Sequence, residues 1–234
     1  MLGAGASTLA QDTVKVAPGS AIIDGSFIEP YTNKWEVYVQ TPDGQENHIR
    51  YWTDYVQIID QDGTPLMHRV QDIYGSDRSL QSTWINVVEH KSLIPKRFTV
   101  QGPTGAIVFI DFNKERVISG SNQNEAGTFS SDTLAAGQLY YDWNLYGMLL
   151  VGLPFDEGTT YELPYWSTQN NASTSVFATI GKQEETETLS GEKISTNPVS
   201  TSDGFTFYLS KKAPYVIKLV WDLPNGNKMI WRKI

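Results

Sequence analysis

The sequence predicts a mainly β fold, in which a curved antiparallel sheet (a half-barrel or open roll) surrounds one buried helix near residues 133–151. Turn-forming residues punctuate the chain at short intervals, as in an antiparallel meander. The segments between the turns are rich in aromatic and β-branched residues. Several alternate apolar with polar residues, which is typical of strands with one solvated face. One apolar segment without this alternation supplies the predicted helix.

The predicted strands lie between turn sequences that combine Gly with Pro, Asp or Asn. Asx-Gly pairs favour two-residue hairpin turns because both residues tolerate a positive φ. In chain order, the turns are Pro42-Asp43-Gly44, Asp62-Gly63, Pro103-Thr104-Gly105, Asp203-Gly204 and Pro224-Asn225-Gly226-Asn227. The clearest strand segments are residues 35–39, 55–59, 107–112, 205–209 and 215–221. The polar stretch 183–193 is interpreted as two strand ends that meet at a Ser190-Gly191 turn.

The predicted helix begins after Ser131-Asp132, which can cap its first turn, and ends before Pro154. Its segment, residues 133–155, carries Asp142 as its only charge and has apolar residues on every face. We expect such a helix to be buried on most sides, with the sheet wrapped around it. It is too short and too interrupted to be a transmembrane helix. Asp142 should either be exposed at the open side of the sheet or pair with Lys or Arg.

The first ten residues are interpreted as a signal-peptide remnant. Thr8-Leu9-Ala10 fits the small-x-small pattern of a signal-peptidase site, which predicts a periplasmic or extracellular protein. Residues 11–234 contain no internal repeat and no linker long enough to force two domains. We therefore expect residues 11–234 to form a single β-rich domain.

The composition argues against several function classes. The chain of 234 residues has no Cys, which removes disulfides, thiolate metal sites and a cysteine nucleophile. Its formal net charge of −8 at pH 7 argues against nucleic acid as a partner. His48, His68 and His90 lack the close spacing of metal ligands. We therefore assign no cofactor, no metal site and no catalytic residues.

Five segments carry a resemblance to a known family. They are residues 52–69, Trp84-Ile85-Asn86-Val87-Val88-Glu89, Leu93-Ile94-Pro95, residues 141–154 and Lys212-Ala213-Pro214-Tyr215-Val216-Ile217-Lys218. In these the chain resembles an uncharacterised family of secreted bacterial envelope proteins (a domain of unknown function), similar in architecture to the lipoprotein-carrier half-barrels. The resemblance covers residues 14–234 and implies a strongly curved sheet wrapped around helical plug elements over an apolar cavity. It implies no catalytic residues, and without Cys we expect no lipid anchor of the kind some members carry.

Aromatic and aliphatic residues in and after the predicted helix form the candidate ligand site. Met and aromatic side chains adapt to varied ligands, and small-molecule sites are mostly apolar. The candidate residues are Tyr140, Trp143, Tyr146, Met148, Leu149, Tyr165 and Trp166. The same side chains could instead fill the interior of the sheet, and the sequence leaves both alternatives open.

The sequence favours a non-catalytic protein that binds or carries an apolar or amphipathic molecule of the cell envelope by burying it against the helix. One alternative is a structural protein of the envelope that contacts a protein partner through edge strands or loops. A further alternative is a glycan or ester hydrolase. Its candidate acids are Asp111, Glu115, Asp142, Glu157 and Glu162.

Overall fold

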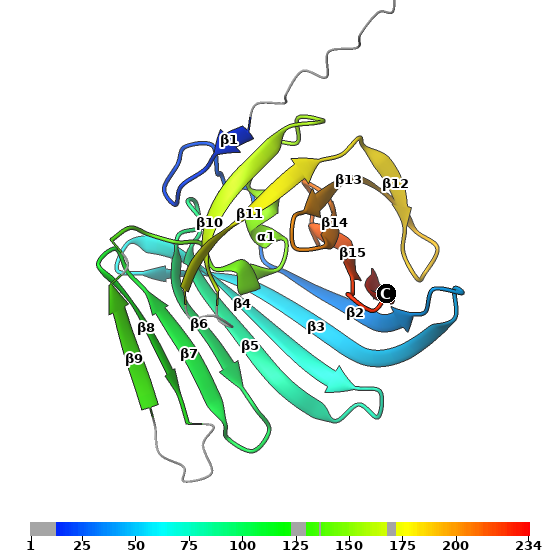
Figure 1. The fold of residues 1–234 in the computed structure, drawn as a ribbon, viewed down its shortest axis with the longest axis horizontal. Helices are drawn as coiled ribbons and strands as arrows, with labels where there is room; N and C mark the ends of the chain where they lie inside the picture. Colours follow the sequence, from blue (N-terminus) through cyan, green and yellow to red (C-terminus); the bar gives the residue numbers. More distant parts are fainter. Residues whose placement is uncertain (1–12, 123–129, 136, 168–171) are drawn as a thin grey trace, which may run out of the picture.

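The computed structural model describes residues 13–122, 130–135, 137–167 and 172–234. The predicted signal-peptide remnant, residues 1–10, lies outside the described residues. Within the described parts of the chain, sixteen strands form one open sheet that curves around a short α-helix (Figure 1). The predicted fold class, a mainly β protein with a curved open sheet and one helix, is confirmed.

The strands of the N-terminal half, through the last strand before the helix, are β1 (Thr13–Lys15), β2 (Tyr31–Gln40), β3 (Glu46–Gln61), β4 (Thr64–Gly75), β5 (Leu80–Glu89), β6 (Pro95–Gln101), β7 (Ile107–Phe112), β8 (Arg116–Ser121) and β9 (Ser130–Ala135). Two helical elements follow, the 3-10 helix η1 (Trp143–Leu145) and α1 (Met148–Val151). The remaining strands are β10 (Thr160–Ser167), β11 (Ala172–Ile180), β12 (Glu184–Glu187), β13 (Lys193–Thr201), β14 (Phe205–Leu209), β15 (Val216–Asp222) and β16 (Lys228–Lys233).

The sheet runs in the order β1-β10-β11-β13-β14-β15-β16-β2-β3-β4-β5-β6-β7-β8-β9, and β12 pairs with β13 beside this path. The pairings are antiparallel except that of β1 with β10, which is parallel. The last strand, β16, pairs with β2 and so joins the two halves of the chain. Because β1 and β9 lie at opposite ends of the order, the sheet stays open.

The turn sequences connect strands as predicted. Asp62 (φ 54°) and Gly63 (φ 81°) form the two-residue turn between β3 and β4. Two positive φ values are those of a type I′ turn, whose twist matches that of the flanking strands. Strands β7 and β14 have the predicted bounds, and the polar stretch 183–193 contains β12 and the turn before β13.

The helix lies inside the predicted segment but is much shorter than the expected residues 133–151. Ser130–Ala135 pairs with β8 as strand β9, and among the described residues of the segment the helical turns are those of η1 and α1. Between these two elements, Tyr146 (φ 42°) and Gly147 (φ 83°) are left-handed, a conformation that interrupts a right-handed helix. Strand pairing thus overrides helix propensity in the first part of the segment. Nowhere in the described residues does a helix have the length and apolar character needed to cross a membrane.

Residues 141–153, called the plug below, lie inside the curve of the sheet (Figure 1). The second half of the plug is core: five of its side chains are at most 2% exposed and share one apolar cluster with the inward-facing strand residues. These are Met148, Leu149, Leu150, Val151 and Leu153. Since full burial of one such large side chain contributes about 1.5–3 kcal/mol, packing fixes this half against the sheet. The first half, around η1, borders open space.

Candidate functional site

A cavity of about 560 Å³ lies between the plug and the concave face of the sheet. Ten aromatic side chains border it, from strands on both sides of β2 in the sheet order and from the plug. They are Trp52, Trp84, Trp143, Tyr146, Tyr165, Trp166, Phe205, Phe207, Trp221 and Trp231. The other lining residues are Arg50, Ile73, Asn144, Ser167, Asp203 and Met229. The cavity therefore has a mostly aromatic wall with a few polar groups, which is the usual make-up of a small-molecule site.

Trp52 on β3 is the centre of the aromatic wall. Its ring makes edge-to-face contacts with Trp84 (5.8 Å between ring centroids), Tyr146 (5.8 Å) and Trp231 (5.9 Å). Strand alternation aims Trp52 inward, and β5 and β16, each separated from β3 by one strand, place Trp84 and Trp231 on the same face. Edge-to-face contacts of this kind each contribute about 0.5–1.5 kcal/mol beyond the burial of area, so the wall is rigid.

The opposite wall comes from β14 and β15. Phe205 and Trp221 are cross-strand partners, and their rings stack at 5.0 Å with an interplanar angle of 11°. Phe205 also stacks on Phe207 at 5.7 Å. This wall presents flat aromatic faces to the cavity.

The first half of the plug forms the floor. The Trp143 indole donates a hydrogen bond to the Asp203 carboxylate (2.8 Å), and its ring lies 5.5 Å from that of Tyr165. Thr201 also donates to the Asp203 carboxylate, at 2.5 Å. The lining carboxylate is therefore already occupied by two donors from the protein.

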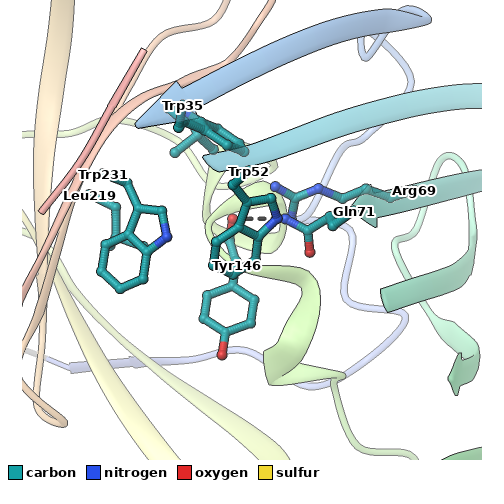
Figure 2. Close-up of a pocket in the computed structure, with 8 residues that line it drawn as sticks. Trp35, Trp52, Arg69, Gln71, Tyr146, Leu219 and Trp231 are labelled. Atoms are coloured by element: carbon teal, nitrogen blue, oxygen red, sulfur yellow. Dashed lines mark hydrogen bonds between the residues drawn. The ribbon is translucent and has the colours of Figure 1, made fainter. Parts of the chain in front are cut away.

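A buried ion pair holds the floor in place. Arg69 and Asp54 are both 0% exposed, and the guanidinium donates to the two carboxylate oxygens at 2.8 and 2.9 Å. Tyr31 donates to the same carboxylate at 2.9 Å. Arg69 also donates to the carbonyls of Leu145 and, at 3.2 Å, Tyr146 (dashed line in Figure 2). One buried arginine thus joins the sheet to the point where the plug backbone turns left-handed.

Figure 2 shows how Arg69 reaches the back of the aromatic wall. With its amide oxygen facing the donors, Gln71 accepts hydrogen bonds from the Trp52 indole (3.1 Å) and from Arg69 (3.2 Å). A gap of only about 10 Å³ remains between these groups and Trp35 and Trp231. This region is packed, in contrast to the large cavity beside it.

Asp142 anchors the start of the plug. One carboxylate oxygen accepts from the Asn86 amide at 2.7 Å, and the other accepts from the backbone and side chain of Asn144 at 2.9 and 3.1 Å. Burial raises the pKa of Asp142 to about 6, although these hydrogen bonds and the charge of Arg69 act in the opposite direction. The expectation that Asp142 is exposed or paired with Lys or Arg is wrong, because neutral amides bind it and Arg69 is engaged by Asp54.

Lys211 holds the other end of the plug. Its ammonium donates to the carbonyls of Val151 (2.5 Å) and Leu153 (2.6 Å) at the end of α1 and lies 4.0 Å from the centre of the Phe155 ring. Burial lowers the pKa of Lys211 to about 8. Carbonyls at a helix C-terminus have no intrahelical donors, so this cation satisfies groups that would otherwise be unpaired.

The structure distributes the predicted site residues over two environments. Trp143, Tyr146, Tyr165 and Trp166 border the cavity. Tyr140 packs on Trp166, with 5.5 Å between ring centroids. Met148 and Leu149 lie in the packed core, where the Met148 sulfur lies 3.3 Å from the Tyr31 hydroxyl oxygen.

Sequence reasoning missed the wall residues that the strands supply, among them Trp52, Trp84, Phe205, Trp221 and Arg50. Their signal is the strand alternation itself, which places residues at i and i+2 on one face. Three of the five candidate acids of the hydrolase alternative, Asp111, Asp142 and Glu162, are engaged in separate contacts. Asp111 pairs with Arg97 (2.8 Å), and Glu162 lies 3.8 Å from Lys15.

The family model described as "Protein of unknown function (DUF3108)" matches residues 54–230. The matched region runs from the buried carboxylate of Asp54 into β16 and includes the plug and most of the cavity lining. No curated protein and no solved structure matches the chain.

Proposed function

The chain belongs to the DUF3108 family of proteins of unknown function, and from the cavity inside its sheet we propose that it is a non-catalytic protein that binds or carries an apolar or amphipathic molecule of the cell envelope. The observation that carries the proposal is the aromatic cavity of about 560 Å³. Its volume lies within the roughly 300–1,000 Å³ of typical ligand pockets.

The chemistry of the lining favours binding by burial over catalysis. Aromatic faces dominate the wall, and Asp203 is held by two protein donors. The buried charged groups behind the wall, Asp54 and Arg69, are engaged with one another and with the plug. Affinity should therefore grow with the apolar length of the ligand. At about 0.8 kcal/mol per buried methylene, two added methylenes should tighten binding roughly 15-fold until the cavity is full.

We further propose that the protein acts in the periplasm or at the cell surface. The pattern Thr8-Leu9-Ala10 supports export. An open curved sheet around a short helical plug supports the likeness in architecture to the lipoprotein-carrier half-barrels. In such a role the open side of the sheet would admit and release the ligand.

Native mass spectrometry of detergent-free protein exported to the periplasm tests the proposal, because a bound amphiphile would appear as an adduct that leaves on collisional activation. Tryptophan fluorescence supplies a second readout, since six of the seven Trp residues border the cavity. A ligand that enters should therefore change most of the emission. A mass without adduct, together with unchanged fluorescence after incubation with envelope lipid extract, would refute ligand binding and favour the alternative of a protein partner.

Variants locate the site. Trp143→Ala and Trp221→Ala each remove an aromatic wall residue, and each should weaken binding roughly tenfold or more, given about 1.5–3 kcal/mol for a buried aromatic side chain. Phe177→Ala is the matched control, because Phe177 is 43% exposed and lies outside the cavity lining. Equal affinities in the three variants would place the ligand elsewhere.

A further inference from the structure

We infer that the ligand of the cavity is an amphiphile with an anionic headgroup and that Arg50 binds this headgroup. The inference rests on the proposed function and adds to it the chemical class of the ligand. Arg50 is the cation among the lining residues of the cavity.

Strand β3 sets the position of Arg50. Asp54, Trp52 and Arg50 alternate along the strand and face the interior together. Asp54 is 0% exposed and holds Arg69, Trp52 is 4% exposed and forms the aromatic wall, and Arg50 is half-buried. Exposure thus increases from the plug towards Arg50. An apolar chain against Trp52 would carry its headgroup to the level of Arg50.

The Arg50 side chain is unpaired within the described residues. Its guanidinium makes no hydrogen bond there, and no carboxylate oxygen lies within 4.0 Å of it. Three other arginines on the sheet each hold a carboxylate. These pairs are Arg69 with Asp54, Arg97 with Asp111 and Arg232 with Glu46.

The other charged group of the cavity lining is already engaged by the protein. Asp203, the carboxylate of the lining, is taken by Trp143 and Thr201. An incoming polar group that accepts hydrogen bonds and carries negative charge is the complement of such a wall.

The guanidinium group suits this task. Its planar set of donors matches a carboxylate or a phosphate with two parallel hydrogen bonds. The protein as a whole has a net charge of −8, so an anion gains nothing from the overall field and depends on a local cation. Carboxylate and phosphate share this chemistry, and separate probes distinguish them.

The test uses three probes with the same ten-carbon chain, namely decanoate, decyl phosphate and 1-decanol, each below its aggregation concentration. Binding to the full chain is measured by Trp fluorescence for the wild type, Arg50→Gln and Arg116→Gln. Arg116 is exposed, lies on β8 outside the cavity lining and provides the same change of charge.

We expect at least one anionic probe to bind the wild type roughly tenfold more tightly than 1-decanol, a ratio typical of one charge-assisted pair. Arg50→Gln should abolish that preference, so that neither anion binds more tightly than 1-decanol, whereas Arg116→Gln should retain it. Tighter binding of decanoate than of decyl phosphate would indicate a fatty-acid-like ligand, and the reverse order would indicate a phospholipid-like ligand.

The inference of an anionic headgroup and the proposed binding function would be refuted by different results. If 1-decanol and both anions bind equally, or if Arg50→Gln weakens all three probes alike, the anionic headgroup is refuted while the apolar cavity stands. If none of the probes binds, the proposed function itself is refuted.

Discussion

Replacing Arg69 by Met is the most direct test of how the plug is held. Arg69→Met keeps much of the side-chain volume but removes the two hydrogen bonds to Asp54 and those to the carbonyls of Leu145 and Tyr146. It leaves a carboxylate that is 0% exposed with Tyr31 as its remaining donor. Removing one partner of a buried pair typically costs about 3–5 kcal/mol, so we expect a loss of about 4 kcal/mol in the free energy of unfolding.

The double variant Asp54→Leu/Arg69→Met separates two costs in stability. One is the cost of an unpaired buried carboxylate, and the other is the cost of losing the hydrogen bonds from Arg69 to the plug. With both charges removed, two carbonyls lose their donor at about 1 kcal/mol each and the Tyr31 hydroxyl keeps only the Met148 sulfur as an acceptor, so the double variant should lose only about 2–3 kcal/mol. It should therefore be more stable than Arg69→Met alone.

Urea denaturation followed by Trp fluorescence measures these differences. The matched control is Arg97→Met, which breaks a cross-strand pair of similar geometry with Asp111 on the exposed surface and should cost less than about 1 kcal/mol. If Arg69→Met is no more destabilising than Arg97→Met, or if the double variant is less stable than Arg69→Met, the role assigned to the buried pair of Arg69 and Asp54 is refuted.

Two further predictions concern the same plug. Because burial raises the pKa of Asp142 to about 6 from 3.8, the native state binds more protons than the unfolded chain between these values, and stability should fall by roughly 2 kcal/mol as pH rises from 4 to 6. Asp142→Asn should remove this fall in urea titrations at several pH values, since the unpaired Asn86 oxygen can accept from the new amide, and an unchanged pH profile would contradict it. Gly147→Ala should cost about 2–3 kcal/mol, because φ is +83° and the new Cβ would lie 2.8 Å from Phe207. Gly44→Ala is the control, since Gly44 has φ +90° and open space around it, so it should lose only the roughly 1 kcal/mol that a left-handed backbone costs a non-Gly residue. Equal losses of stability for the two variants in thermal melts would exclude a steric clash at Gly147.

Local chemistry explains why the strands could be predicted from the sequence. Asp62-Gly63 specifies a two-residue turn, and a two-residue turn sets the register of the whole β3–β4 pair. From that register, Asp54 and Arg69 are diagonal neighbours on one face, close enough for a long side chain to bridge. The buried ion pair was therefore within reach of sequence reasoning once the turn was recognised.

The extent of the helix was not predictable in the same way. Ala135 and its neighbours favour helix, yet Ser130–Ala135 gains a full ladder with β8, and a distant strand is invisible to local propensity. The left-handed backbone at Tyr146 likewise coincides with a tertiary contact, since Arg69 donates hydrogen bonds to the carbonyls of Leu145 and Tyr146 there. The strand residues that line the cavity were missed because alternation identifies the two faces of a strand but does not tell which face becomes the concave one.

The same tertiary contacts explain why a cavity can persist in so small a fold. A helix of four residues has no stability of its own, so the plug depends on anchors. Arg69 holds its middle, Asp142 its start and Lys211 its end, each through buried or half-buried polar contacts to the sheet or within the plug. Because these anchors and the α1 core fix the plug, the rings of Trp143 and Tyr146 are not needed to fill the interior. They stay free on one side, and a ligand meets a wall that is already in place, which lowers the entropy lost on binding.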